Sequence, residues 1–387
     1  MNIKQVYELV NTATRETLGE SVIVNEDLSN VVDIGDAVFR ADGVETFAKS
    51  LINHIGRVIF VNRVYKGSAP SVIMDAWAYG SVCEKISSKM PTATENEAWM
   101  LKDGTSYDPN IFHAPEAVTK FFNKYVTFEI DRSIPEYQLK QSFQSAEQMG
   151  AFVSLIFNEI DKSLTVKVDA LVLRTISNFI ASTLKAEYPS NDYTAKSTVK
   201  AVNLLYLYNE THPDSPLTKQ NAMTSPDFIR FASVTMKNYA KRLATMSTLF
   251  NMGAQERFTP DDMLKVILLA EFEANAEVYL YDGVGQFGDR YIKIPDAETV
   301  TYWQGSGTDY SFENTSAINV KTADGDTVEV NGILGVMFDR DALGICNVER
   351  SVKTHINNKG DFVNYFYKHT AGYFNDFNEN FVVFFIA

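Results

Sequence analysis

The sequence predicts an α+β fold, and three stretches carry that prediction. Apolar residues at three- and four-residue spacing indicate a helix from Ser145 to about Ala186, and no proline occurs until Pro189. Residues 125–131 (YVTFEID) alternate apolar and polar side chains, as a half-buried strand does. Residues 348–387 are rich in aromatic and β-branched residues, so we expect strands there. Strand and helix adjoin in sequence, which favours one α+β unit.

The predicted helix is long. Ser145 and Gln148 fit a capping box, in which the serine oxygen and the glutamine side chain satisfy free N–H groups of the first turn. At about 1.5 Å per residue the helix would span roughly 60 Å. The pattern fits a core helix of an enzyme as well as a single spine across a flat molecule. A break near Asp161–Ser163 would halve its length.

Composition excludes several classes of protein. The chain has 387 residues, of which 45% are hydrophobic and 22% charged, so it is globular and long enough for two or three domains or one elongated subunit. The net charge of −14 and the pI near 4.9 disfavour non-specific nucleic-acid binding, and we do not expect a direct DNA reader.

The cysteines and the chain's hydropathy indicate a cytoplasmic setting. Cys83 and Cys346 lie far apart without metal-ligand spacing, as expected for idle thiols in a reducing cytoplasm. The polar N-terminal stretch shows no signal peptide. No run of about 18 apolar residues predicts a membrane span.

The N-terminal third predicts an arm followed by a projecting loop. We expect a short helix at Ile3–Leu9, an extended segment over 21–39, a helix at Val44–Ile55 and a strand at Gly56–Gly67. The following polar excursion, to residue 110, predicts a loop or hairpin used for contact with other molecules. Its aromatic residues are the candidates for that contact, although they fit local packing equally well: Trp77, Tyr79 and Trp99.

The middle of the chain predicts an inserted α/β domain over residues 187–338. The elements expected around and within it are a helix at His113–Lys124, a strand or helix at Lys200–Tyr208, one or two helices over Ser225–Phe250, a helix opened by Thr259, a strand at 276–283, a hairpin over 318–330 signalled by Asp324-Gly325, and a strand after Asn331-Gly332.

The end of the chain predicts buried strands. Two aromatic strands flank the turn at 357–360, and a third strand, Phe381–Ala387, is apolar throughout and must be buried on both faces. We expect it to pair with the strand that precedes the long helix. The first and last parts of the chain would then share one sheet covered by that helix.

The strongest enzymatic pattern is the glycine motif Gly283-Val-Gly285-Gln-Phe-Gly288. A dinucleotide site needs a strand before such a motif and a helix after it, whereas here the continuation is strand-like and broken by Pro295. A plain glycine-rich loop is the simpler interpretation. The five histidines lack metal-ligand spacing, and Asp261-Asp262 and Asp339–Asp341 fit a helix first turn and a strand-end turn. We expect no catalytic residues, no cofactor and no metal.

Three stretches resemble the major capsid (head) protein of a tailed bacteriophage with the Hong Kong 97-type fold. Residues 149–176 resemble the spine helix of that family, and residues 332–347 resemble the strand and turn that leave its axial domain. Residues 353–387 resemble its aromatic return strands, with an asparagine-rich turn before a final apolar strand. The chain is also similar to the head proteins of small podoviruses that infect Gram-positive hosts.

The resemblance implies a division of the chain into four parts. Residues 1–55 would be the N-terminal arm and residues 56–110 the extended loop. The peripheral domain would combine residues 111–186 with residues 339–387, and the axial domain would be residues 187–338. The implied function is self-assembly into the icosahedral shell that encloses the double-stranded DNA genome of a tailed phage.

The resemblance also implies partners. These are other copies of the chain in hexamers and pentamers, a scaffolding protein, the portal, and packaged DNA bound without sequence specificity, with no membrane. Since the chain starts almost directly with the arm, a scaffolding protein would be separate or absent. The virion capsid would be assembled in the host cytoplasm. Two alternatives remain: a nanocompartment (encapsulin-like) shell protein, and a nucleotide-dependent enzyme using Gly283–Gly288.

Overall fold

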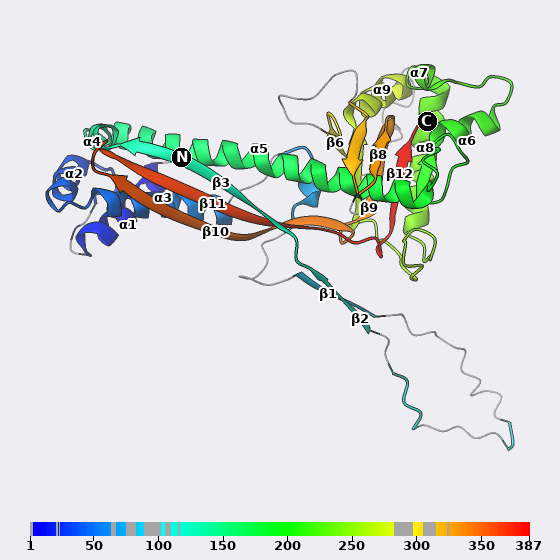
Figure 1. Ribbon diagram of the computed structural model, residues 1–387, viewed down its shortest axis with the longest axis horizontal. Helices are drawn as coiled ribbons and strands as arrows, with labels where there is room; N and C mark the ends of the chain where they lie inside the picture. The colour runs from blue at the N-terminus through cyan, green and yellow to red at the C-terminus, as the bar shows by residue number, and fades with distance from the viewer. Residues whose placement is uncertain are drawn as a thin grey trace.

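The computed structural model describes an elongated body with a long helix along it, a block of helices and strands at one end, and a projecting hairpin (Figure 1). The described residues are 3–20, 22, 24–62, 67–74, 83–88, 102–104, 110–114, 117–281, 297–304, 315–322 and 325–387.

The long helix predicted from the apolar stripe is present and unbroken. Helix α5 covers Ala146–Glu187, 42 residues, which at about 1.5 Å per residue is roughly 63 Å. Ser145 is its N-cap, and the Ser145 hydroxyl accepts a hydrogen bond from the Gln148 N–H at 3.2 Å. The alternative of a break near Asp161–Ser163 is therefore excluded.

Helix α5 connects two separate hydrophobic cores. Its first half, from Met149 to Leu164, packs into a core shared with the N-terminal helices. Its second half, from Val168 to Leu184, packs into the core of the block at the other end. From Leu171 to Leu184 nearly every side chain is buried, as expected where a helix passes through a core instead of lying on its surface.

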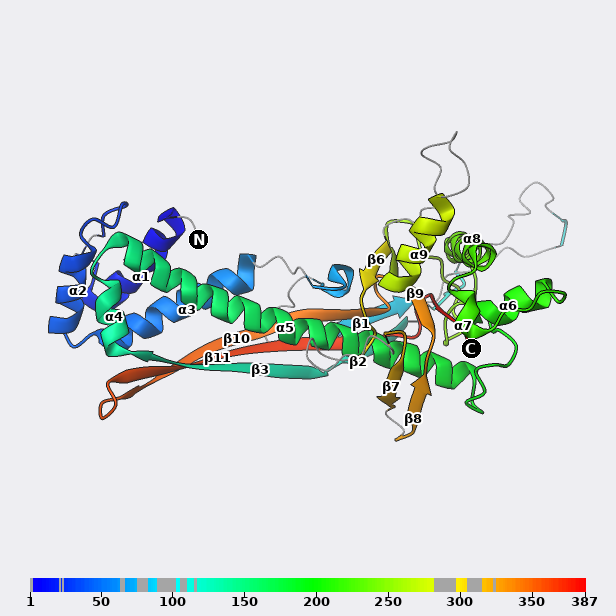
Figure 2. The ribbon, with the colours of Figure 1, turned by 90° about the horizontal axis from the view of Figure 1, so that it is seen from above.

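Helices cover residues 31–39 and 56–62, so the predictions of an extended segment over 21–39 and of a strand at 56–67 were wrong for those residues. The helices are α1 (Ile3–Leu18), α2 (Val31–Arg40) and α3 (Val44–Asn62). In α2 the buried residues are Val31, Ile34, Gly35 and Val38. That spacing is one face of a helix, and the β-branched composition of the segment concealed it. The three helices gather at the end of α5 remote from the block (Figure 2).

A three-stranded antiparallel sheet lies along α5 in the order β10-β11-β3. Its strands are β3 (Tyr125–Pro135), β10 (Leu343–Asn357) and β11 (Phe362–Asn375). Strand β3 alternates as predicted, since Val126, Phe128 and Ile130 are half-buried between exposed neighbours. Strand β3 pairs with β11, so the sheet does combine early and late parts of the chain, but through a different strand from the final one that was predicted. A short helix, α4 (Glu136–Ser142), separates β3 from α5.

The final strand β12 (Phe381–Phe385) is buried at every position, as predicted, but its expected partner was wrong. It lies in a five-stranded sheet of order β4-β12-β9-β5-β6, parallel to β4 and antiparallel to β9. A strand that is apolar on both faces needs a layer on each side. Beside β12 the sheet is covered by the end of α5 on one face and by α8 on the other, since Phe179 contacts Phe381 and Tyr239 contacts Phe384.

The block that contains this sheet mixes helices and strands. Its elements are β4 (Ala201–Asn203), α6 (Leu204–Thr211), α7 (Lys219–Ala222), α8 (Pro226–Leu243), β5 (Leu264–Leu269), α9 (Ala270–Tyr281), β6 (Ala297–Val300), β7 (Ile318–Lys321), β8 (Thr327–Val330) and β9 (Ile333–Asp339). The hairpin predicted over 318–330 is present as β7–β8. The predicted helix after Thr259 is instead strand β5, and the predicted strand at 276–283 is helix α9 up to Tyr281. Short apolar runs do not distinguish the two structures.

A second hairpin projects from the body: β1 (Cys83–Ser88) pairs with β2 (Ala117–Phe122). The helix expected at His113–Lys124 was therefore wrong. A single turn of 3₁₀ helix, Pro70–Val72, precedes the hairpin, and Ile73 beside it bridges to Ile345 of β10. Among the described helices, none combines the length and apolarity needed to cross a membrane.

Candidate assembly surfaces

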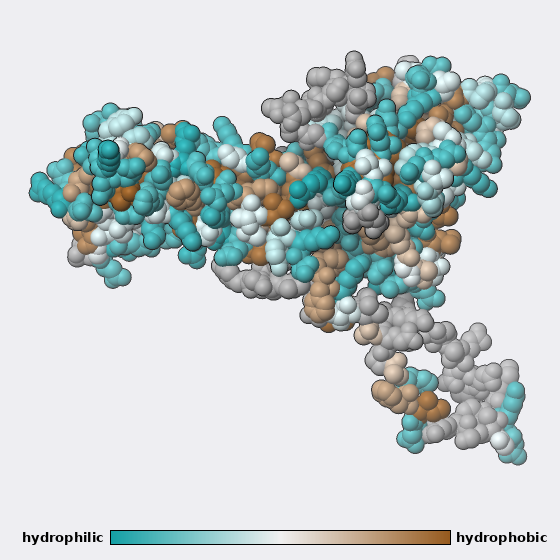
Figure 3. Space-filling model, in the orientation of Figure 1, coloured by the Kyte–Doolittle hydropathy of each residue, from teal (hydrophilic) through white to brown (hydrophobic). Residues whose placement is uncertain are grey.

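The projecting hairpin has two unlike faces. In the register of β1 and β2, Lys85 lies opposite Lys120 and Ile86 opposite Thr119. Successive side chains alternate between faces, so Lys85 and Lys120 share one face, while Ile86 and Phe121 belong to the other. Ile86 is 68% exposed and Phe121 62% exposed. Figure 3 shows a hydrophobic patch at the root of the hairpin on a surface that is otherwise largely hydrophilic in this view.

The lysine face is joined to the body by a cluster of charges. Lys85 Nζ lies 3.1 Å from Asp376 Oδ2 and 2.7 Å from Glu379 Oε1. Lys120 Nζ lies 2.7 Å from Asp376 Oδ1. The Asp376 side chain is only 2% exposed. Both acids belong to the turn between β11 and β12, so the turn predicted from its asparagine-rich sequence anchors the hairpin. We call Lys85, Lys120, Asp376 and Glu379 the hairpin anchor.

The electrostatics of the hairpin anchor favour the charged forms on both sides. Burial alone would raise the pKa of the Asp376 carboxyl. The hydrogen bond from Lys120 and the charge of Lys85 outweigh it, and the pKa of Asp376 is lowered. Burial would likewise lower the pKa of Lys85, but the hydrogen bond and charge of Glu379 outweigh it and raise that pKa. The two shifts agree, so Asp376 and Lys85 are both ionised around neutral pH.

A loop at the edge of the block exposes a second set of apolar side chains. It joins α8 to β5 over residues 244–263 and is held by hydrogen bonds between the Ser247 and Arg257 backbones at 2.9 and 3.1 Å. The Asn251 amide bonds to the Gln255 backbone in both directions, each at 2.8 Å. Its exposed apolar residues are Met246 (42%), Leu249 (59%), Met252 (36%) and Phe258 (50%). We call this segment the axial loop.

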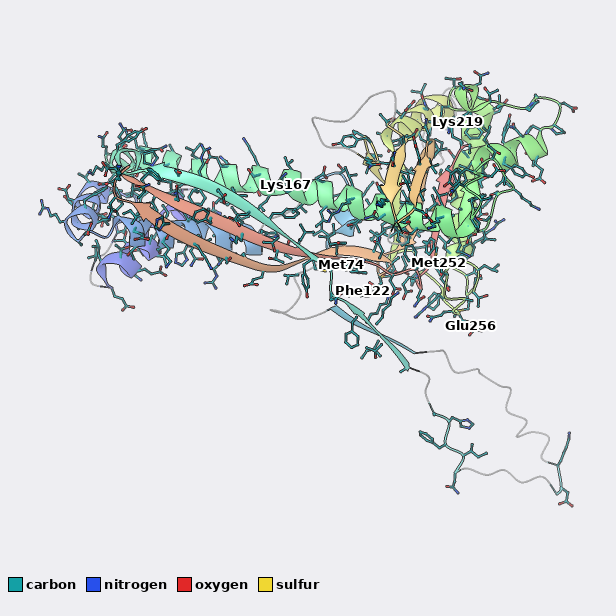
Figure 4. The ribbon with its side chains drawn as sticks, viewed as in Figure 1. Met74, Phe122, Lys167, Lys219, Met252 and Glu256 are labelled. Carbon is teal, nitrogen blue, oxygen red and sulfur yellow. The ribbon has the colours of Figure 1, made fainter. Side chains whose placement is uncertain are left out.

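The axial loop and the hairpin lie on the same side of the molecule. Figure 4 labels Met252 and Glu256 on the loop and Phe122 at the hairpin root, below the long helix in this view. Arg257 Nη2 of the loop also lies 3.7 Å from Glu379 Oε1 of the hairpin anchor. The loop was not predicted as a surface: Met246 and Leu249 fell within the helices expected over Ser225–Phe250, and residues 251–258 were assigned to no element.

The outward face of the three-stranded sheet is polar, in contrast. Lys368 Nζ lies 2.8 Å from Glu129 Oε2, and the Thr127 and Thr370 hydroxyls are 3.0 Å apart. The hydrogen bond from Lys368 lowers the pKa of the exposed Glu129 carboxyl and outweighs the smaller, opposing effect of desolvation. Cross-strand pairs of this kind add little stability but keep the face soluble.

The aromatic residues proposed for contact from the sequence, Trp77, Tyr79 and Trp99, lie outside the described residues. The exposed large apolar residues in the described part of the hairpin and its connection are Ile86 and Phe121 on the strands, and Ile111 (60%) and Phe112 (84%) near the tip. Residues 85–87 (KIS) and 119–122 (TKFF) carry the alternation of a strand, which could have identified Ile86 and Phe121 as exposed. The helix expected at 113–124 hid that pattern in the second segment.

No site for chemistry emerges from the part of the chain that the structure describes. Within it, no group of three His, Cys, Asp or Glu residues could hold a metal ion. Gly283–Gly288 lies outside the described residues, and the element before it is helix α9 where a strand was expected. Asp339 does form a strand-end turn, accepting hydrogen bonds from the Thr259 hydroxyl at 2.8 Å and the Asp341 N–H at 3.0 Å.

Comparison with known proteins gives a match over nearly the whole chain. The family model described as "Phi29-like phage major capsid protein" matches residues 10–385. No curated protein matches.

Similar solved structures include the capsid of Staphylococcus phage Andhra, at 11% identity and a TM-score of 0.46, covering 82% of this chain and 83% of that one. The capsid of cyanophage P-SCSP1u gives 10% identity and a TM-score of 0.44, covering 82% and 86%. Because these TM-scores lie below 0.5, the family match alone carries the assignment.

Proposed function

The chain belongs to the Phi29-like phage major capsid protein family, and on that premise we propose how its copies join. It is a major capsid protein, a structural protein that forms the shell of a tailed bacteriophage. The observation that carries this function is the family match over residues 10–385. The sequence resemblance to the Hong Kong 97-type fold agrees with it.

We propose a peripheral domain built on the first half of α5, with residues 1–55, the three-stranded sheet and the hydrophobic core that they share. The axial domain is the block of residues 187–338. Strand β12 joins it, since this strand pairs within the five-stranded sheet. The excursion over residues 56–110 includes the first strand of the projecting hairpin.

The contacts between copies use the surfaces that the subunit leaves uncovered. The outer face of the hairpin exposes the apolar side chains Ile86 and Phe121, and the axial loop exposes Leu249 and Phe258. Unlike patches that join head to tail generate rings where the rotation between copies closes, and closed rings of this kind are pentamers and hexamers. Trp77, Tyr79 and Trp99 remain candidates for the same contacts.

The wider partners follow from the shell function. We propose packaged DNA held without sequence-specific contacts, a scaffolding protein and the portal as partners, with assembly in the host cytoplasm. The net charge of −14 supports the absence of tight DNA binding. The protein has a structural role and is not an enzyme.

The direct test is expression of the full chain, alone and with the other assembly proteins of its phage, followed by electron microscopy. We expect closed shells of uniform size. A compact monomer at high concentration, even with a scaffolding protein supplied, would contradict the proposed function.

A further inference from the structure

The turn between β11 and β12, residues 376–380, is held from two sides by elements that lie far from each other in sequence. Its acids bind the lysines of the projecting hairpin. The axial loop holds the same turn through the backbone, since the Met252 N–H donates to the Phe377 carbonyl at 2.8 Å. The Phe381 N–H donates in turn to the Phe250 carbonyl of that loop at 2.9 Å. The hairpin and the axial loop therefore meet at this turn.

The Glu379 carboxylate lies between the two elements. Its Oε1 atom lies 2.7 Å from Lys85 Nζ of the hairpin and 3.7 Å from Arg257 Nη2 of the axial loop. Both cations face the same oxygen, but only Lys85 is at hydrogen-bond distance. The Glu379 side chain is 11% exposed, so its charge needs a cation beside it.

The Arg257 guanidinium is only partly engaged. Its Nη2 atom donates to Gln255 Oε1 at 3.1 Å, within the axial loop. Its Nε atom is buried and has no hydrogen-bond partner among the described residues. A buried N–H without an acceptor is costly, and hydrogen bonds to a carboxylate are strong. A closer approach to Glu379 would therefore stabilise the guanidinium.

Lys85 can leave Glu379 and keep other partners. Its Nζ atom also lies 3.1 Å from Asp376 Oδ2 and 3.2 Å from the Asp341 carbonyl oxygen. Glu379, in contrast, has no second cation at hydrogen-bond distance within the described part of the chain. Without Lys85 the buried carboxylate would be unpaired, and a closer approach of Arg257 would remove that cost.

We propose that Glu379 is a shared counter-ion that couples the hairpin to the axial loop. In one arrangement Lys85 binds Glu379, and the axial loop is tied to the turn mainly by its backbone. In the other arrangement Arg257 binds Glu379 directly, and the loop is held more firmly. The coupling is a property of the single subunit and goes beyond the proposed shell function. A neighbour that draws Lys85 from Glu379 would thereby order the axial loop of the same copy for its own contact.

Hydrogen exchange in the unassembled full-length chain tests the coupling through the sign of the change. Lys85→Met frees Glu379 for Arg257, so amide exchange in residues 83–88 should accelerate while exchange in the axial loop slows by about fivefold. A general loosening of the structure would instead accelerate both.

Lys120→Met is the matched control. Lys120 lies on the same face of the hairpin as Lys85, and its ion pair among the described residues is with Asp376. This variant should accelerate exchange in the hairpin and leave exchange in the axial loop unchanged, because Glu379 keeps Lys85.

The reciprocal variant does not depend on how Lys85→Met folds. Arg257→Met removes the competing cation, so exchange in the axial loop should accelerate and exchange in the hairpin should slow by about fivefold, because coupling free energies act in both directions. When Glu379→Gln is already present, Lys85→Met should no longer slow exchange in the axial loop.

Unchanged or faster axial-loop exchange in Lys85→Met would overturn the coupling. Equal slowing in Lys120→Met would also overturn it, because the effect would then come from the hairpin as a whole. A chain that shows the opposite changes but never forms shells would contradict the proposed function and support the coupling. Shells formed by a chain without these changes would contradict the coupling alone.

Discussion

The final strand and the projecting hairpin are attached to the same turn by opposite means. Strand β12 is buried at all five positions and is paired on both sides, so apolar contact holds it. Strands β1 and β2 pair only with each other within the described residues. A two-stranded hairpin is marginally stable by itself, and its connection to the turn is made by the charges of the hairpin anchor.

This difference separates the part of the subunit that must stay fixed from the part that we propose makes contacts between copies. Apolar burial resists changes of salt and geometry, whereas ion pairs allow a hairpin to be oriented without giving it a core of its own. The turn at Asp376–Asn380 serves both: Phe381 begins the buried strand, while Asp376 binds Lys85 and Lys120. The following predictions test that division.

The largest effect is expected in β12. Phe384 is fully buried and its ring lies 5.5 Å from that of Tyr239. Phe384→Ala should lower the free energy of unfolding by about 3–5 kcal/mol, because it removes apolar burial and leaves a cavity. Urea unfolding of the unassembled chain measures it. Phe112→Ala, at a side chain 84% exposed, is the control and should leave the midpoint unchanged. Similar losses of unfolding free energy in Phe384→Ala and Phe112→Ala would contradict the division between a buried, fixed strand and an exposed hairpin.

A smaller effect is expected at the hairpin anchor. Asp376→Asn leaves Lys85 and Lys120 without their shared carboxylate. It should lower the free energy of unfolding by on the order of 2 kcal/mol, less than for a fully buried ion pair because Lys120 is partly exposed. Amide hydrogen exchange in residues 83–88 and 117–122 should accelerate, while exchange in β12 stays slow. Asp326→Asn removes an exposed ion pair elsewhere and should not alter hairpin exchange. Equal acceleration in β12 would show that the two attachments are not independent.

The anchor also predicts a pH dependence. The pKa of Asp376 is lowered in the folded chain, so its stabilisation is complete above the unfolded pKa of about 3.9 and is lost as pH falls through the folded value. Wild type and Asp376→Asn should therefore differ in thermal stability at pH 6 and converge as the pH falls below about 4. Thermal melts across this range measure the difference. A difference in thermal stability between the two proteins that does not change with pH would show that the charge of the Asp376 carboxylate does not cause the stabilisation.

The smallest effect on the subunit is expected on the outer face of the hairpin. Ile86→Ser with Phe121→Ser should change the free energy of unfolding by less than about 0.5 kcal/mol, since both side chains are already largely exposed. The same variant should assemble poorly, because its copies lose apolar contact area. Assembly that equals wild type would remove this face from the proposed contacts.

The parts of the fold that the sequence predicted are those with strong periodicity. The first half of helix α5 keeps one apolar stripe after a serine cap, and β3 alternates cleanly. The N-terminal helices escaped prediction because segments such as GRVIFV combine β-branched residues with a helical spacing, and only the packing of Ile55 and Ile59 into the first core decides between them. The partner of β12 depends on contacts far apart in sequence, which no local pattern contains.

The candidate surfaces were less predictable than the fold. The sequence predicted the excursion as a contact element, and that stays a prediction; the residues that orient its hairpin, Lys85 and Lys120, were not found. Their acidic partner Asp376 lies 256 residues from Lys120 in the chain. The axial loop was missed for a related reason: exposed Leu249 and Phe258 resemble core residues until the structure shows what covers them.

One measurement tests the central claim most directly: a reconstruction by electron cryo-microscopy of shells assembled from the full-length chain. We predict that Ile86 and Phe121 of each hairpin are buried against a neighbouring copy, while Lys85 and Lys120 still contact Asp376 of their own chain. Shells in which these two apolar side chains remain in solvent, with the hairpin making no contact between copies, would contradict it.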